Sequence, residues 1–350
     1  MISTPMQEDF TALSKMAEVI ETLQDKRIYI TGASGQIGWY LVHFICFLIR
    51  SGNLRCELNA HLRSTDRLVE KYPDHASLPC HFAIAEDAAQ PLAEMDCDLL
   101  IHCASRASPK HFAATPVDVM TPNAMLTHAL LEKLRLRNPA CLFVYFSTTG
   151  VTGFIADEQR PSSESDYGPL SCTDLSNCYL ESKRFGEMLS LAYHRQYGIP
   201  VLIIRPSITY GPGFELDDGR SYADFIQLLL QRKPIRLTSD GSAIRNFLYI
   251  SDFVRGLFLV IGKAPNGSVY NISSPSPTSI LALASMLNES VHDSPLGPVE
   301  RQPQAQMMTR VNFQSTDASV RQLEDLGWNE TVSLLEGFRK TLQHYEEQKQ

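Results

Sequence analysis

Short apolar runs alternate with helical stretches along much of the chain, and this alternation constrains the fold more than any other feature of the sequence. The runs occupy residues 27–30, 56–60, 81–84, 99–102, 142–146 and 201–204. Strands that alternate with helices usually form a parallel sheet, because each parallel connection must cross over the sheet and a helix provides that crossover. The predicted fold class is therefore α/β, with a doubly wound parallel sheet.

The two ends of the chain depart from this pattern. Beyond residue 205 the alternation gives way to loops rich in Gly, Pro and Asp, with helices predicted over residues 222–231 and 333–345. We expect this part to form a smaller C-terminal α/β domain that covers a substrate. Near the start, apolar residues recur at helical spacing from Phe10 to Leu23, which predicts one amphipathic helix over residues 8–24, added before the main fold.

Three glycines, Gly32, Gly35 and Gly38, connect the first predicted strand to the first helix of the alternating part. Glycines at this spacing permit a tight turn, let backbone N–H groups approach a pyrophosphate and allow close packing of the helix on the strand. Because the loop lies in the first strand–helix unit, it indicates dinucleotide binding in a Rossmann-type sheet rather than an ordinary turn.

The residues after the second predicted strand bear on which dinucleotide binds. An acid there would bind the ribose 2′-hydroxyl of NAD, but the sequence has Arg63 and Ser64 instead. These two side chains could accept a 2′-phosphate, which favours NADP over NAD, although Arg63 as a solvated loop residue explains the position almost as well. Glu86 or Asp87, after the third strand, could contact the adenine or could be plain loop acids.

Tyr179 and Lys183 are four residues apart in a stretch, 179–197, whose apolar residues have helical spacing. Positions i and i+4 share one face of a helix, so the ammonium can lie near the phenol. The cation, together with an oxidised nicotinamide, would favour the phenolate and prepare the tyrosine as a general base. Taken alone, such a pair is usually a surface pair.

Residues 147–153 (STTGVTG) directly follow the apolar run 142–146. Ser, Thr and Gly are common where strands end, so this stretch by itself favours a polar turn. In combination with the glycine loop and the Tyr179–Lys183 pair, however, it resembles the extended short-chain dehydrogenase/reductase family, in its nucleotide-sugar epimerase and dehydratase branch. The hydroxyls at 147–149 fall where that family places its substrate-orienting hydroxyl.

The resemblance extends over residues 27–342 and rests on several segments in the family's order. Besides 31–38 (TGASGQIG) and 179–183 (YLESK), these segments are 121–127 (TPNAMLT), 205–213 (RPSITYGPG), 245–252 (RNFLYISD), 269–272 (VYNI) and 326–328 (LGW). Residues 101–112 (IHCASRASPKHF) resemble the sugar-facing loop of nucleotide-sugar decarboxylases from the same branch.

The resemblance implies roles for particular residues. Tyr179 would remove the proton from a sugar hydroxyl, at C4, Thr148 would hold that oxygen, and Lys183 would bind the nicotinamide ribose and tune Tyr179. The implied cofactor contacts are Gly32, Ser34, Gly35, Gln36, Ile37, Gly38, Arg63, Asp87, Ala104, Tyr179 and Lys183. The implied substrate contacts are Ser105, Asn123, Thr149, Arg220 and Arg245; the two arginines are candidates for the diphosphate, with surface ion pairs as the alternative.

The helix predicted near the start of the chain and the range of the resemblance together indicate how the chain is divided. Residues 1–26 would form an N-terminal helical extension and residues 27–206 the NAD(P)-binding Rossmann domain, to which 243–275 return. Residues 207–242 and 276–350 would form the substrate-binding domain. Family members commonly pair through the helices that bear Asn123 and Tyr179, so a homodimer is expected.

The sequence also departs from the family's pattern. Dehydratases of this branch have an acidic pair, and decarboxylases a glutamate, immediately after the hydroxyl residue, where this chain has Thr149 and Gly150. Eliminating water needs a general acid and base at those carbons, so the substitution argues against a 4,6-dehydratase. Ile208 and Thr152 also replace residues frequent in the family, which affects the substrate pose but not the hydride-transfer residues.

The leading hypothesis is an NAD(P)-dependent nucleotide-sugar epimerase that oxidises a sugar hydroxyl transiently and returns the hydride, with NAD or NADP tightly bound. The alternatives are a decarboxylase, dehydratase or 4-keto reductase of the same family and, in another class, a non-catalytic dinucleotide-binding regulator.

Composition and charge restrict the partners. The net charge is −8, without a block of Lys and Arg, which argues against nucleic acid or a membrane surface. The eight cysteines include no Cys-x-x-Cys pair and are expected to be reduced thiols of a cytoplasmic protein. The histidines have no second ligand at metal spacing, so no metal is expected.

Overall fold

A seven-stranded parallel sheet forms the centre of the protein. The structure is a computed structural model that describes residues 2–93, 96–153, 155, 160–301 and 317–349. The strand order is β11-β6-β5-β4-β1-β2-β3, and all neighbouring strands are parallel. The strands are β1 (Arg27–Thr31), β2 (Glu57–Leu62), β3 (His81–Ile84), β4 (Leu99–His102), β5 (Leu142–Phe146), β6 (Val201–Pro206) and β11 (Ser268–Ile272). The predicted fold class is confirmed, since each of the six apolar runs is a strand of this sheet.

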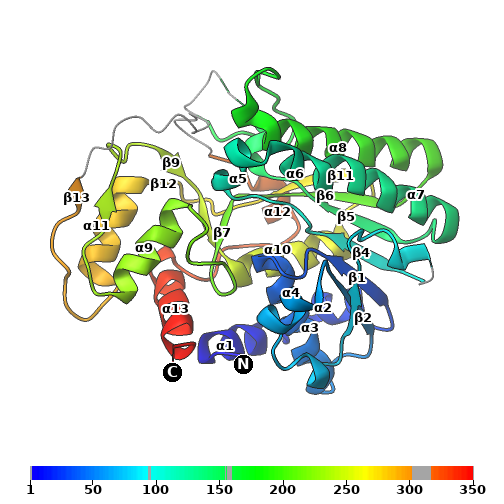
Figure 1. Cartoon of the computed structure of the whole chain (residues 1–350), viewed down its shortest axis with the longest axis horizontal. Coiled ribbons are helices and arrows are strands. Elements are labelled where there is room, and N and C mark those ends of the chain that lie inside the picture. Colours follow the sequence, from blue (N-terminus) through cyan, green and yellow to red (C-terminus); the bar gives the residue numbers. More distant parts are fainter. Residues whose placement is uncertain (1, 94–95, 154, 156–159, 302–316, 350) are drawn as a thin grey trace.

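Helices cover both faces of the sheet (Figure 1). On one face, α7 (Thr127–Arg137) and α8 (Cys178–Tyr197) pack on Phe143, Tyr145 and Ile203, whereas α3 (Gln36–Arg50) and α10 (Ile250–Lys263) pack on the other. Neighbouring residues of a strand point to opposite faces, so the central strands β1, β4, β5 and β6 contribute apolar side chains to the clusters on both faces of the sheet. Such a sheet brings every strand's carboxyl end, and the loops that follow, to one edge.

The remaining elements surround this edge and the sheet's ends. The helices are α4 (Thr65–Lys71), α5 (Pro109–Ala114), α6 (Pro116–Thr121), α9 (Ser221–Leu230), α11 (Ile280–Ser290), α12 (Arg321–Asp325) and α13 (Leu334–Glu347). Three pairs of short strands accompany them: β7 (Ile208–Tyr210) with β10 (Phe247–Tyr249), β9 (Ile244–Arg245) with β12 (Thr278–Ser279), and β8 (Arg236–Leu237) with β13 (Glu300–Arg301). The helices predicted at 222–231 and 333–345 are α9 and α13.

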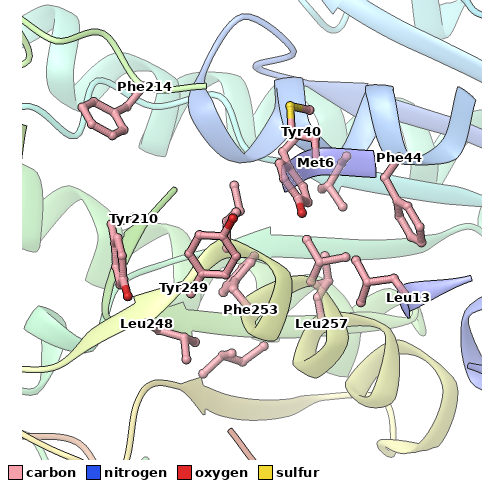
Figure 2. Close-up of a cluster of buried hydrophobic side chains, with 14 of the residues drawn as sticks. Met6, Leu13, Tyr40, Phe44, Tyr210, Phe214, Leu248, Tyr249, Phe253 and Leu257 are labelled. Carbon is pink, nitrogen blue, oxygen red and sulfur yellow. The ribbon is translucent and has the colours of Figure 1, made fainter. Parts of the chain in front are cut away.

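The N-terminal segment differs from its prediction. It forms two helices, α1 (Thr4–Leu13) and α2 (Ala17–Leu23), so the single helix predicted over residues 8–24 is wrong. The break at residues 14–16 lets α1 pack against α13 and α2 against α10, which one straight helix could not do. Met6 and Phe10 are fully buried, and the Phe10 ring centroid lies 5.0 Å from that of Tyr40 and 5.4 Å from that of Phe44. Figure 2 shows Met6 beside Tyr40, so the segment packs into the main core.

A buried carboxylate fastens this segment to three distant elements. Asp9 on α1 accepts hydrogen bonds from the phenols of Tyr40 on α3 (3.1 Å) and Tyr249 (2.8 Å) and from Lys340 Nζ on α13 (2.7 Å). Burial raises the pKa of Asp9, and the lysine and the two phenols partly offset that rise. Removing one partner from a buried charge is costly, so the network fixes α1 in place.

A search of the described part of the chain for a membrane-crossing helix gives none with the necessary length and apolar character.

Candidate active site

The glycine loop between β1 and α3 is built so that side chains cannot enter it. Gly32 has φ +72°, and a Cβ there would lie 2.6 Å from the backbone nitrogen of Ala104 in the loop after β4. A Cβ on Gly38 would lie 2.4 Å from the carbonyl oxygen of Gly32. Gly35, in contrast, has ordinary space around its Cα and is the N-cap of α3. The first turn of α3 therefore approaches the strand closely, and its free N–H groups are where a pyrophosphate can bind.

Neighbouring side chains hold the two sides of this loop. Tyr72 donates a hydrogen bond to the carbonyl oxygen of Ala33 at 2.6 Å, and Thr31 Oγ1 lies 2.7 Å from His102 Nδ1. The Oγ of Ser105, just beyond Ala104, is buried and has no hydrogen-bond partner among the described residues. A preformed cradle with an unsatisfied hydroxyl beside it fits a bound dinucleotide.

Three guanidinium groups gather near the end of β2, where the adenosine part of a dinucleotide would lie. Arg63 is exposed, and lost hydration followed by the charges of Arg106 and Arg67 lowers its pKa. Ser64 caps α4 by accepting a hydrogen bond from the backbone N–H of Arg67 at 3.3 Å. Asp87 is exposed and accepts a hydrogen bond from the backbone N–H of Ala89 at 2.9 Å, as a loop acid does.

Thr148 and Tyr179 meet at the carboxyl end of β5. Thr148 precedes a 3₁₀ turn (Thr149–Thr152), and its Oγ1 accepts a hydrogen bond from the N–H of Gly150 at 3.3 Å. Tyr179 is in the first turn of α8. Burial raises the pKa of Tyr179 to about 12, and the charge of Arg220 and a hydrogen bond with Thr148 partly offset the rise. The structure thus brings together three residues that are far apart in the sequence.

Lys183 lies one turn further along α8 with its ammonium group buried beneath Tyr179. Its Nζ donates a hydrogen bond to the carbonyl oxygen of Phe146, and it lies 6.0 Å from the Tyr179 ring centroid and 4.9 Å from that of Tyr145. Burial lowers the pKa of Lys183 to about 7, with Cys103 and Glu187 opposing that effect. Burial favours the neutral form of Lys183, whereas a nearby anion, such as the phenolate of Tyr179, favours its charged form. The lysine is therefore positioned to stabilise that phenolate with its positive charge.

Phe112 on α5 also lies at this site, although the sequence did not single it out. Its ring stacks on that of Tyr179 with centroids 5.1 Å apart and an interplanar angle of 11°. It belongs to the loop 101–112 that resembles a sugar-facing segment, so its position after β4 was the available signal. The sequence could not show that Phe112 stacks on Tyr179, because the stacking depends on how α5 and α8 are placed relative to each other.

Arg220 and Arg245 occupy different surroundings. Arg220 precedes α9, donates a hydrogen bond to Asp218 at 2.8 Å and lies 5.0 Å from the Tyr222 ring centroid. Its charge also acts on Tyr179, so it faces the site. Arg245 is half-buried on β9, its Nη1 donates to the carbonyl oxygen of Ile244 at 2.6 Å, and burial lowers its pKa.

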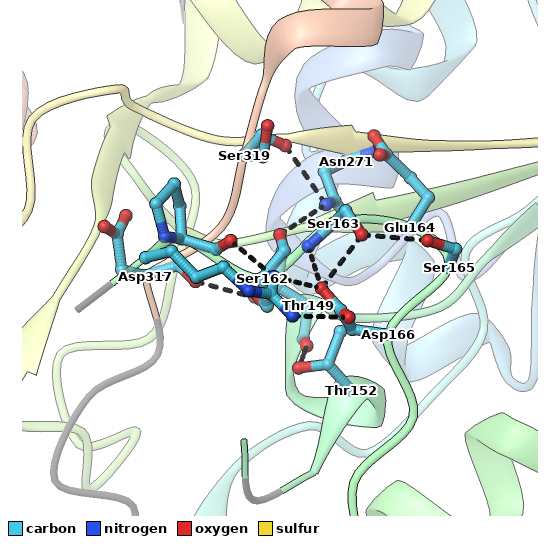
Figure 3. Close-up of polar contacts among 12 residues, drawn as sticks. Thr149, Thr152, Ser162, Ser163, Glu164, Ser165, Asp166, Asn271, Asp317 and Ser319 are labelled. Atoms are coloured by element: carbon cyan, nitrogen blue, oxygen red, sulfur yellow. Dashed lines mark hydrogen bonds and ion pairs between the residues drawn. The ribbon is translucent and has the colours of Figure 1, made fainter. Parts of the chain in front are cut away.

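Asn123 and Thr149 are buried. Asn123 lies in a π-helical turn (Pro122–Leu126), where its amide donates hydrogen bonds to the carbonyl oxygen of Val119 and to Ser182 Oγ on α8, both at 3.0 Å. This arrangement ties the turn to the helix that bears Tyr179 and gives Asn123 a supporting position rather than an exposed one. Thr149 accepts a hydrogen bond from Thr152 Oγ1 at 3.0 Å (Figure 3).

A polar segment continues beyond Thr152 toward the C-terminal part of the chain. Figure 3 shows Ser162 and Glu164 beside Asn271, Asp317 and Ser319. Glu164 Oε1 accepts a hydrogen bond from the N–H of Asn271 at 3.0 Å, and Ser162 pairs with Ala318 in a β-bridge. These contacts fix the chain just after the Thr148 turn, a support that no local sequence pattern indicated.

Within the described ranges, no three His, Cys, Asp or Glu side chains are grouped so that they could hold a metal ion.

The fold and the site together define an enzyme of the dinucleotide-dependent α/β class. The "NAD dependent epimerase/dehydratase family" matches residues 28–273, which is more than half of the sequence. The chain therefore belongs to this family, and the resemblance inferred from its motifs is confirmed.

Among curated relatives, UDP-glucuronic acid decarboxylase 6 of Arabidopsis thaliana is 30% identical over 312 residues, covering 89% of this chain and 86% of that protein. UDP-glucuronic acid decarboxylase 1 of the same plant is 29% identical over 319 residues, covering 91% of this chain and 69% of that protein.

The crystal structure of UDP-glucose 4-epimerase from Thermotoga maritima matches with a TM-score of 0.75 at 23% identity, covering 93% of this chain and all of that chain. UDP-glucuronic acid 4-epimerase from Bacillus cereus matches with a TM-score of 0.71 at 24% identity, covering 92% and 99%. These likenesses support the fold.

Proposed function

We propose that the protein is an NAD(P)-dependent nucleotide-sugar epimerase that oxidises a sugar hydroxyl, at C4, to a ketone and then reduces it from the other face. The observation that carries the proposal is the grouping of Thr148, Tyr179 and Lys183 beside the glycine loop, with Thr149 and Gly150 where the acids of dehydratases and decarboxylases would stand. Oxidation and re-reduction need a base for one hydroxyl proton and no further acid.

The residues divide the chemistry among them. A nicotinamide cofactor held at the glycine loop would supply the hydride chemistry at the sugar carbon. Tyr179 takes the hydroxyl proton, and Thr148 keeps the sugar oxygen next to the phenol. Lys183 favours the phenolate through its charge, which has to counter the burial that raises the pKa of Tyr179 to about 12. Arg220 and Arg245 bind the diphosphate, and Ser105 and Thr149 contact the sugar.

A nucleotide-sugar decarboxylase is the second candidate, because the curated relatives reported above are UDP-glucuronic acid decarboxylases. That reaction would also begin with oxidation at C4. The bond from C5 to the carboxyl carbon would then break with release of carbon dioxide, C5 would take a proton from solvent, and the hydride would return to C4. The absence of an acidic side chain at Thr149 and Gly150 favours the epimerase.

The test is incubation of the purified protein in D₂O with UDP-glucose, UDP-glucuronic acid and other nucleotide sugars, followed by NMR of the products. An epimerase inverts one carbon, releases no carbon dioxide and incorporates no deuterium at carbon, because the hydride returns. Carbon dioxide release with one deuterium at C5 would assign the decarboxylase instead. Full biological activity of a Tyr179→Phe variant would favour the non-catalytic regulator.

The proposal includes NADP as the preferred cofactor. It is supported by Arg63 at the end of β2, close enough to Arg67 and Arg106 for their charges to lower its pKa. Arg67 and Arg106 already form ion pairs with Glu70, Glu215 and Asp118, so Arg63 supplies the guanidinium that would bind a phosphate dianion. The glycine loop itself serves NAD and NADP equally, so the preference depends on this cluster.

The proposal also includes the assembly and setting of the protein. A homodimer through the α6–α8 surface is supported by large exposed apolar side chains there: Val117 (72% exposed), Met120 (40%), Phe185 (52%) and Met188 (69%). An apolar patch of this kind is typical of an interface.

The eight cysteines of the protein are free thiols, which suits a cytoplasmic enzyme. We retain the division into residues 1–26, 27–206 with 243–275, and 207–242 with 276–350.

A further inference from the structure

The short helix α5 lies over the catalytic tyrosine and is attached to the C-terminal part of the chain. Ser108 donates a hydrogen bond to the carbonyl oxygen of Asp218. Lys110 Nζ lies 3.0 Å from the carbonyl oxygen and 3.4 Å from the carboxylate of Asp217. Residues 108–110 thus contact the segment that leads into Arg220, whose charge lowers the pKa of Tyr179.

Phe112 is the part of α5 that covers the phenol. Its ring is nearly parallel to that of Tyr179, with centroids 5.1 Å apart, and Cys178 Sγ lies 3.8 Å from its carbonyl oxygen. Carbon atoms in contact are about 3.5–4 Å apart, so a pyranose between two parallel rings would require them to be about 7–8 Å apart. A sugar therefore cannot lie between the rings as they stand, and it must reach the phenol at its hydroxyl edge.

We propose that α5 is a cover that closes on residues 217–218 and retains the sugar ketone between its formation and its reduction, with Phe112 as a positioning residue and Lys110–Asp217 as the fastening. This inference rests on the proposed function. In the forward step the sugar loses a hydride to the nicotinamide and a proton to the Tyr179 phenolate. A ketone that escapes has lost two electrons relative to the substrate, and these two electrons remain on the cofactor.

The fastening is suited to opening in each turnover. The side chains of Lys110 and Asp217 are 38% and 79% exposed, and ion pairs between exposed side chains are weak. The stack on Tyr179, in contrast, is half-buried. Breaking the exposed contacts would free α5 to admit a nucleotide sugar, whereas the aromatic contact excludes water from the phenol once the cover has closed.

The first experiment measures how often the ketone escapes. Each variant is supplied with the nucleotide sugar it epimerises, in the presence of hydroxylamine, which traps free ketone as an oxime, and the ratio of oxime to epimer is determined. We expect Phe112→Ala to raise this ratio at least 10-fold and Phe112→Tyr to leave it near that of the wild type. His111→Ala, on the same helix, is the matched control. An unchanged ratio in Phe112→Ala would overturn the role of Phe112.

The contact between Lys110 and Asp217 is tested with variants of these two residues. Asp217→Ala removes the carboxylate but keeps the carbonyl oxygen that Lys110 also contacts, so we expect a smaller rise in the ratio than for Lys110→Ala, which loses both contacts. The double variant should match Lys110→Ala alone. Effects that add independently would show that the two residues do not act through each other.

Hydrogen exchange separates this inference from the proposed function. In the wild-type protein with cofactor and no sugar, the amides of residues 110–114 should exchange several times more slowly than in Lys110→Ala, while β5 is unchanged. Equal rates would overturn the fastening whatever reaction the enzyme catalyses. If no sugar in the panel is epimerised by the wild type, the proposed function fails, and exchange still tests the cover.

Discussion

The cofactor side and the substrate side of the site are built in different ways. On the cofactor side, Gly32 and Gly38 are confined by backbone atoms, which fix the shape of the loop. On the substrate side, Arg220 is held by Asp218 and Phe112 lies on Tyr179, so side chains hold one another. A binding site formed by backbone atoms has its shape before the cofactor binds, whereas a site formed by side chains can rearrange when a sugar binds.

This difference predicts how each side responds to substitution. Changes on the backbone-built side should act on the folded protein itself, while changes on the other side should act on chemistry or specificity and leave the fold intact. Variants on the two sides of the site test that contrast.

Tyr179→Phe should lower kcat by about 10³-fold, because general base catalysis contributes about 10²–10⁴-fold. The thermal unfolding temperature should change little, since only a hydroxyl is removed. Tyr197→Phe, at the exposed end of the same helix, is the control. Steady-state rates and thermal scans of the three proteins suffice, and a variant that loses rate and stability together would contradict the contrast.

Gly38→Ala should destabilise the protein by about 1–3 kcal/mol even without cofactor, because the new methyl group meets the Gly32 carbonyl oxygen and overpacks the loop. Gly35→Ala should leave unfolding nearly unchanged and weaken only cofactor binding, because a Cβ there has 3.4 Å to its nearest neighbour. Thermal unfolding and cofactor titration distinguish the two. Equal stability of both variants would show that the loop adapts.

Lys183 should make the stability of the cofactor-free protein depend on pH. Burial lowers its pKa from 10.5 to about 7, so between these values the unfolded chain binds more protons than the folded one and stability rises with pH. The slope contributed by one group is at most about 1.4 kcal/mol per pH unit. Denaturant unfolding from pH 7 to 10 should show a flatter dependence in Lys183→Met; parallel curves would mean that the ammonium remains hydrated.

Arg63→Gln should have the smallest effect, raising the Kd for NADP about 10-fold, which corresponds to about 1.4 kcal/mol, with the Kd for NAD unchanged. The change removes one guanidinium from the group that includes Arg67 and Arg106. Arg55→Gln, exposed at the opposite end of β2, is the control. Equal losses for both cofactors would indicate a general charge effect.

The sequence predicted those parts of the protein that depend on neighbours along the chain. The six strands, the glycine loop and the placement of Tyr179 over Lys183 follow from local periodicity and from spacing within one helix. Phe112 and Asp218 were missed because their contacts join distant segments, with Ser108 and Asp218 110 residues apart. The break between α1 and α2 was missed for the same reason, since Asp9 has partners 240 and 331 residues away.

The two ends of the described chain lie together. The backbone N–H of Thr4 donates a hydrogen bond to Glu347 on α13 at 2.8 Å, and Figure 1 shows α1 beside the last turn of that helix. Fluorescent donor and acceptor labels placed near these residues would transfer energy efficiently in the folded protein. Because α1 also carries Asp9, loss of that transfer would report the release of α1 from the core.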